Sequence, residues 1–291
     1  MRLNLHFVFK PLAISFLFFL TLTSCGGNSL SPFTQSQNST EALYVEIEKK
    51  LNISDFDGVV DLIIAQSAGF QTLDRVKYYL GNAYLGKCGF GLSTFSEKYG
   101  SVTASQMFQK YAYSFTGVTV DPPSCGLAQA AFESIADDSS YGSKKAFSLL
   151  MVGFSKIGTY LKSDLDQDDD GVAEKDPCLD TDLSDADAKQ VISGMGLILN
   201  NFSGIVGDIL GAESTSDITN FQTACEGVLG VGNCSITDAN SSTIDPTMIA
   251  AFRFLLDSSN DGFGTCDTTE ITPADGDGIE MCCVPGGDPN P

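Results

Sequence analysis

Apolar residues recur every three or four positions along most of this chain, between residues 41 and 257. This spacing places them on one face of an α-helix, and no run alternates apolar and polar residues for long enough to predict a strand. The helical pattern is clearest in the segments 54–64, 73–84, 104–115, 127–135, 143–161, 185–200, 205–210, 218–225 and 248–256. We therefore predict an all-α domain over residues 41–257, built as an antiparallel bundle or as a solenoid-like array of helices.

Polar residues and glycines mark where these helices should begin and end. Hydroxyl side chains at the start of three segments are the expected N-caps, namely Ser54, Thr72 and Ser184. Gly69 is expected to end the first of these helices, and Gly86 and Gly89 the second, while Asp121-Pro122-Pro123 should break the pattern further on. The run over residues 146–154 is apolar all round, which predicts a central, buried helix.

Residues 1–24 have the pattern of an export signal. Arg2 and Lys10 precede an apolar run over residues 12–22, and small residues then lead to Cys25. Leu22-Thr23-Ser24-Cys25 resembles the lipobox of bacterial lipoproteins, Leu-x-Ser-Cys, in which the cut falls before the cysteine and the new N-terminal cysteine carries lipid. The alternatives are a plain signal peptide and a transmembrane anchor.

The lipobox resemblance implies a location for the protein. Cys25 would carry lipid, including palmitate, and would hold the chain in the membrane. Gly26 rather than an aspartate follows it, which by resemblance to Gram-negative lipoproteins implies the outer membrane, facing the periplasm. Residues 25–40 are small and polar, and we expect a flexible tether that spans on the order of 20 Å.

Composition excludes several classes of function. The one histidine, His6, lies in the leader, and the chain has no tryptophan. Without histidine the exported chain can build neither a Ser-His-Asp nor a Cys-His site, nor a histidine-ligated metal site. With 16 Lys and Arg against 37 Asp and Glu, the formal net charge of −21 repels nucleic acid and anionic headgroups. We therefore expect a non-enzymatic protein without a nucleic-acid partner, which attracts divalent cations or a basic partner.

One helical segment carries a short motif. Leu80-Gly81-Asn82-Ala83-Tyr84 resembles the Leu-Gly-x-x-Tyr signature of tetratricopeptide-repeat helices, and Ser54-Asp55-Phe56-Asp57 resembles the opening of the second helix of that repeat. In that family, arrays of paired helices build a groove for peptides or partners. Exported lipoproteins of this type include the T components of TRAP transporters, which serve periplasmic substrate uptake. The alternative is an ordinary antiparallel helix pair with a glycine contact.

An acidic loop over residues 163–183 carries the strongest chemical signal. Alternate oxygen ligands converge on one cation when glycine at the sixth position makes a sharp turn, here Gly171. The expected calcium ligands are Asp166, Asp168, Asp170, the carbonyl of Val172, Glu174 and, to close the shell, Asp176, Asp180 or Asp182. The pattern resembles thrombospondin type 3 and dockerin loops, which implies structural calcium. The alternative is a solvated acidic loop, although acids after a helix end are unfavourable without a compensating positive charge.

Cysteine usage predicts disulfide bonds, as is usual in exported proteins. Eight cysteines follow Cys25, namely Cys88, Cys125, Cys178, Cys225, Cys234, Cys266, Cys282 and Cys283. Cys225 and Cys234 flank a glycine-rich turn and are the pair that we predict first. Cys266 is expected to pair with one of the last two, and the first three then compete for what remains. Residues 258–291 are expected to form an irregular tail held by such bonds.

Together these features predict a membrane-anchored, periplasm-facing lipoprotein whose helical body binds a protein or a small solute. The alternative is a carboxylate-based hydrolase of the cell envelope, since carboxylates alone can catalyse hydrolysis. Two facing carboxylates in a deep cleft, with raised pKa values, would distinguish the hydrolase from the binding protein.

Overall fold

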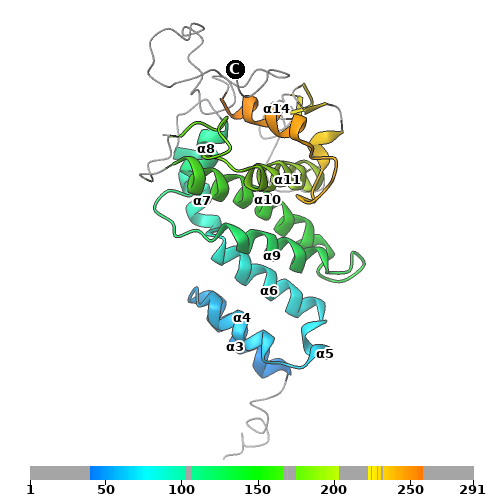
Figure 1. Cartoon of the computed structure of the whole chain (residues 1–291). Helices are drawn as coiled ribbons and strands as arrows, with labels where there is room; N and C mark the ends of the chain where they lie inside the picture. Colours follow the sequence, from blue (N-terminus) through cyan, green and yellow to red (C-terminus); the bar gives the residue numbers. More distant parts are fainter. Residues whose placement is uncertain are drawn as a thin grey trace, which may run out of the picture. The chain divides into compact units, whose positions relative to one another are not determined.

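The computed structural model of the chain describes residues 40–101, 107–166, 169, 175–202, 222–223, 225–227, 229–230 and 232–257 (Figure 1). Helices dominate these residues and no strand occurs among them, so the all-α prediction is confirmed. By its internal contacts the chain divides into two units, residues 1–49 and residues 50–291. The boundary falls within α3 (Thr40–Asn52), whose last turn belongs to the larger unit.

The main helices of the larger unit pack in succession. They are α4 (Phe56–Ile64), α5 (Ala68–Gln71), α6 (Asp74–Lys87), α7 (Leu92–Ser101), α8 (Met107–Tyr113), α9 (Pro122–Glu133), α10 (Gly142–Leu165), α11 (Asp185–Phe202), the 3-10 helix η2 (Asn233–Ser235) and α14 (Pro246–Asp257). α6 packs against α4 and α9, and α10 packs against α8, α9 and α11 (Figure 1). α11 in turn contacts η2 and α14, so α6, α9, α10 and α11 form a connected series in which α6 packs against α9 rather than against α7.

Glycines set two close helix contacts. A Cβ atom on Gly153 would lie 2.7 Å from the carbonyl oxygen of Gly194, so α10 and α11 approach each other through their backbones. Gly81 of the Leu-Gly-x-x-Tyr motif faces α9, where the ring of Phe132 lies 2.5 Å from its Cβ position. The motif glycine therefore allows a tight contact between two helices. Such a contact occurs both in tetratricopeptide-type repeats and in ordinary antiparallel helix pairs, so it does not distinguish the two.

Large apolar side chains fill the interior of the larger unit. Phe108 of α8 and Phe252 of α14 are fully buried and meet edge to face, with ring centroids 6.0 Å apart. The middle of α10 is buried, as the apolar run predicts, with Leu150 and Val152 fully inaccessible. Phe147 and Phe154 on the same helix are only partly buried. Within the described ranges, no helix is both long and apolar enough to cross a membrane.

The predicted N-cap of α4 is wrong by one residue. Asp55 caps this helix, because its carboxylate accepts hydrogen bonds from the Gly58 amide (3.0 Å) and from Lys50 Nζ (2.7 Å). Ser54 lies in the preceding turn with a φ of 59°. A carboxylate that meets both a lysine and a helix N-terminus forms stronger, charge-assisted hydrogen bonds than a neighbouring hydroxyl could.

The junction between α4 and α6 also differs from the prediction. The short α5 lies between them, so Gly69 is inside a helix and does not end one. The Thr72 hydroxyl donates to the Gly69 carbonyl at 3.0 Å, and α6 begins without a side-chain cap. The third predicted cap is confirmed, since the Asp187 amide donates to the Ser184 hydroxyl at 3.2 Å where α11 begins.

Other helix limits move by up to one or two turns. α6 runs through Gly86 and ends before Gly89, whose φ of 101° suits glycine. α9 begins at Pro122, earlier than residue 127, because proline in the first helical turn loses no hydrogen bond. α7 was not predicted; none of its residues is fully buried, although Phe95 and Tyr99 pack against the core. The segment 205–210 and most of 218–225 fall outside the described residues.

Candidate functional site

A cleft of about 360 Å³ lies between faces of α6 and α10. Its lining consists of Leu51, Phe56, Tyr78, Tyr79, Asn82, Leu85, Gly86, Phe90, Leu92, Phe147, Ser148 and Met151. The α6 residues recur at spacings of three or four, as do the α10 residues, so each helix turns one face toward the cleft. The volume falls in the range of small-molecule sites, which are mostly apolar with a few polar groups.

The aromatic wall of this cleft depends on a glycine and a fixed tyrosine. A Cβ atom on Gly86 would overlap the ring of Phe56, so α4 lays that ring against the backbone of α6. Arg75 Nε donates to the Tyr79 hydroxyl at 2.8 Å, which holds this side chain in place. The lining residues include neither a carboxylate nor an ammonium group. The cleft therefore offers a largely aromatic and aliphatic surface.

A lysine lies over two aromatic rings, one of which, Tyr78, lines the cleft. The rings of Tyr78 and Tyr141 lie 5.3 Å apart, and Lys144 Nζ lies 5.4 Å from the centroid of the first and 4.8 Å from that of the second. Lys144 precedes Phe147 by three residues and Ser148 by four, so it continues the face of α10 that lines the cleft. An ammonium group over a ring is attracted to the negative face of the π system.

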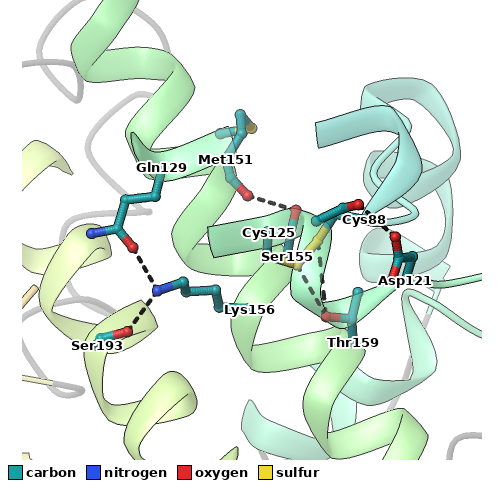
Figure 2. Close-up of a disulfide and its surroundings, with 10 residues drawn as sticks. Cys88, Asp121, Cys125, Gln129, Met151, Ser155, Lys156, Thr159 and Ser193 are labelled. Atoms are coloured by element: carbon teal, nitrogen blue, oxygen red, sulfur yellow. Dashed lines mark hydrogen bonds between the residues drawn. A yellow bond between two sulfur atoms is a disulfide. The ribbon is translucent and has the colours of Figure 1, made fainter. Parts of the chain in front are cut away.

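A second ammonium group lies buried between three helices. Lys156 Nζ of α10 donates to Gln129 Oε1 of α9 (2.5 Å) and to Ser193 Oγ of α11 (2.8 Å), as Figure 2 shows. Gln129 Nε2 in turn donates to Glu133 Oε1 (2.7 Å) and to the Thr237 carbonyl (3.0 Å). Burial lowers the pKa of Lys156 to about 8, against nearby carboxylates that raise it.

The contact between Lys156 and Ser193 is a pairing that composition does not exclude, because a serine nucleophile with a lysine base needs no histidine. Its geometry is structural. The Ser193 hydroxyl donates to the Gln190 carbonyl at 2.8 Å, so the serine oxygen accepts from Lys156 and keeps its own proton on the helix backbone. The two residues are 2% and 0% exposed, and neither lines the cleft. We therefore assign this contact to the packing of α9, α10 and α11.

Two disulfide bonds join described cysteines. Cys225 pairs with Cys234, which confirms the predicted pair. Cys88, directly after α6, pairs with Cys125 at the start of α9, and Thr159 Oγ1 of α10 lies 3.4 Å from the Cys125 sulfur (Figure 2). Cys178 is also disulfide-bonded, to none of these four. The remaining candidates lie outside the described residues, namely Cys266, Cys282 and Cys283.

The structure describes only part of the predicted calcium loop. Asp168, Asp170, Val172 and Glu174 lie outside the described residues, as does Cys25. Asp166 is described and is 7% exposed. Among the residues that the structure describes, no three histidine, cysteine, aspartate or glutamate side chains form a group that could hold a metal ion. The calcium site therefore stays a prediction.

The described loop carboxylates contact protein groups. Asp169 accepts from Lys162 Nζ (2.9 Å) and from the Gly117 amide (2.7 Å); burial raises its pKa, but these bonds hold it below its ordinary value. Burial raises the pKa of Asp176, against a hydrogen bond from the Cys178 amide (2.8 Å) that lowers it. Lys162 therefore provides, at the end of α10, a positive charge that compensates one of the loop carboxylates.

A pair of carboxylates lies where α10 ends and α11 begins. Burial, followed by the charge of Asp187, raises the pKa of Asp164 to about 7. Asp164 Oδ2 is buried and has no hydrogen-bond partner among the described residues, while the Ser184 hydroxyl donates to Asp187 at 2.5 Å. Neither aspartate lines the cleft. Among the described residues, the carboxyl group with a strongly raised pKa, that of Asp164, therefore lies outside the cleft.

Comparison with known proteins gave no match of the chain to a protein-family model, to a curated protein or to a solved structure.

Sequence analysis missed the cleft and the buried lysine. The helical spacing marks one face of α10, with Lys144, Phe147, Ser148 and Met151. It does not show which helix lies opposite this face. Lys156 is a lysine inside a largely apolar helix, and this is a signal for a buried, hydrogen-bonded ammonium group.

Proposed function

We propose that this protein is a lipid-anchored component of the cell envelope, attached through Cys25 to the outer membrane and facing the periplasm, whose helical body binds a small, largely apolar solute. The cleft between α6 and α10 carries this proposal. It has the volume and the aromatic lining of a ligand site, and its walls come from packed helices. The lipobox resemblance and the export pattern support the location.

Several features favour binding over catalysis. The lining residues of the cleft include no carboxylate, lysine or cysteine that could act as a general base or nucleophile on a ligand. The exported chain has no histidine, which is the commonest general base at neutral pH. A carboxylate hydrolase would instead use a pair such as Asp164 and Asp187, but these residues do not line the cleft.

A small solute fits the cleft better than a protein partner. Protein interfaces bury about 800 Å² on each side, whereas this site is a single concave space of about 360 Å³.

Calcium has a separate, structural part in the proposal. Bound by Asp166, Asp168, Asp170, Val172, Glu174 and Asp176, it would join the end of α10 to the start of α11 without touching the solute.

Binding of an uncharged fluorescent probe tests the cleft. The full chain with Cys25→Ser, which needs no detergent for a lipid anchor, is titrated with Nile red. Phe147→Ala removes a ring that lines the cleft and should weaken binding by about tenfold, equivalent to about 1.4 kcal/mol. Phe154→Ala is the matched control, because it removes the same atoms from α10 but outside the lining. Equal effects of the two substitutions, or no probe binding, would refute the assignment of the cleft.

A further inference from the structure

We propose that the ligand of the cleft is a small amphiphile with one anionic end, whose apolar body fills the cleft and whose anion pairs with Lys144. This inference rests on the proposed function, because it names the ligand class of the same site. It follows from where this lysine lies, from the charges around it and from what the cleft lining lacks.

Lys144 is not itself among the lining residues but lies one helical turn before them on α10. It is the first member of a helical stripe that continues with Phe147, Ser148 and Met151, and these three residues line the cleft. Its ammonium group is held over the ring of Tyr78, which also lines the cleft. The lysine stem is long enough to let the exposed ammonium group lean toward a ligand while its methylene groups stay on aromatic surface.

The surroundings leave this charge available for a ligand. In the described part of the chain, no carboxylate lies within ion-pair distance of Lys144, although the whole chain has a formal net charge of −21. Its neighbour Lys145 shows the usual arrangement, since it pairs with Asp137 at 2.8 Å and donates to the Ile135 carbonyl at 2.8 Å. Lys144 also occupies the first turn of α10, where the helix dipole disfavours a cation.

An anion at this position would relieve that unfavourable arrangement. It would meet an ammonium group that has no carboxylate partner, and it would lie near the positive end of a 24-residue helix. The rest of the ligand would face the apolar lining, where no residue could pair with a second charge. A ligand with one terminal anion and an apolar body therefore satisfies both parts of the site, whereas a dianion would leave its second charge unpaired and a cation would be repelled by Lys144.

Matched ligands that differ only in charge test this inference. Octanoate and octanamide have the same chain, and isothermal titration calorimetry of the full chain with Cys25→Ser measures the affinity of each. Octanoate should bind about tenfold more tightly than octanamide, since hydrogen bonds to charged groups are about twice as strong as neutral ones. The preference should shrink as salt is added, because the site is at the surface.

Three variants locate the charge that creates this preference. Lys144→Gln should abolish it by weakening octanoate alone, and Lys144→Arg should keep it. Lys110→Gln is the matched control, because Lys110 also lies over a tyrosine ring, 6.0 Å from the centroid of Tyr99, but Tyr99 does not line the cleft. This control should leave both affinities unchanged.

The outcomes separate this inference from the proposed function. Equal binding of the two ligands, or a preference for octanoate that survives Lys144→Gln, overturns the role of Lys144 and leaves the cleft as an apolar site. Failure of both ligands to bind, together with equal effects of Phe147→Ala and Phe154→Ala on Nile red, overturns the cleft itself.

Discussion

Replacement of Lys156 by methionine should remove a pH dependence of stability that originates in the burial of this lysine. Burial lowers its pKa from the ordinary value of 10.5 to about 8. One pKa unit corresponds to about 1.4 kcal/mol, so the charged Lys156 lowers the free energy of unfolding by about 3 kcal/mol relative to a neutral amine. The hydrogen bonds to Gln129 and Ser193 offset part of this cost, which is why the residue can stay in the core.

The sign of the pH dependence follows from the two pKa values. Because the folded value is the lower one, the unfolded chain binds more protons between about pH 8 and pH 10.5, and the free energy of unfolding rises with pH in this window. Below pH 8 the lysine is charged in both states, and its full cost is present. Between pH 7 and pH 10, Lys156 alone should add about 2–3 kcal/mol to the free energy of unfolding.

Urea unfolding followed by circular dichroism at pH 7, 8, 9 and 10 measures this contribution. Lys156→Met leaves Gln129 Oε1 without its donor, which costs about 1–3 kcal/mol at every pH and does not change the slope. The difference between wild type and Lys156→Met should therefore shift by about 2–3 kcal/mol across the range. Lys189→Met, at a half-buried position of α11, is the matched control for the loss of a lysine side chain. A constant offset for Lys156→Met would refute a lowered pKa in the folded protein.

Three further predictions concern the anchor, the loop and the disulfide bonds. A palmitate analogue should label the wild-type chain in cells, and labelling that persists in Cys25→Ala would contradict lipidation at this residue. Calcium at about a hundred times its dissociation constant should add about 2.7 kcal/mol of stability in thermal melts. This shift should vanish in Asp168→Ala and Asp170→Ala but persist in Asp169→Ala, whose carboxylate pairs with Lys162, and a wild type indifferent to calcium would leave a solvated loop. Joint replacement of Cys88 and Cys125 by serine should lower the free energy of unfolding by about 4 kcal/mol, and that of Cys225 and Cys234 by about 2.5 kcal/mol, because chain entropy grows with loop length. The sequence separations are 37 and 9, and equal losses in urea unfolding would show that loop length does not decide the effect.

Periodicity predicts the long helices of this fold well because each has a sustained apolar face. α10, α11 and α14 extend beyond their predicted segments but keep the predicted type. The ends are harder, since they depend on competition between neighbouring side chains. Asp55 replaces Ser54 as the cap of α4 because Lys50 reaches the carboxylate, and this contact is not visible in the local sequence pattern.

The cleft could not be predicted from the sequence, because it requires knowing which helices face each other. The spacing of Tyr78 and Asn82 marks a face of α6, but nothing local shows that this face meets α10. The adjacent lysines of α10 illustrate the same limit. One residue of helix rotates the side chain by about 100°, which places Lys145 against Asp137 and Lys144 on the tyrosine rings at the cleft.

The covalent bond between Cys88 and Cys125 connects the cleft with the core of the larger unit. It ties the end of α6 to the start of α9, and Thr159 of α10 contacts the Cys125 sulfur, so all three helices meet at this point. A second link joins α10 to α9, because the buried Lys156 of α10 donates to Gln129 of α9. Both walls of the cleft are therefore braced by contacts that do not involve a ligand. A site whose walls are already ordered loses less conformational entropy when a ligand binds, which favours a binding role for the cleft over a role as a hinge.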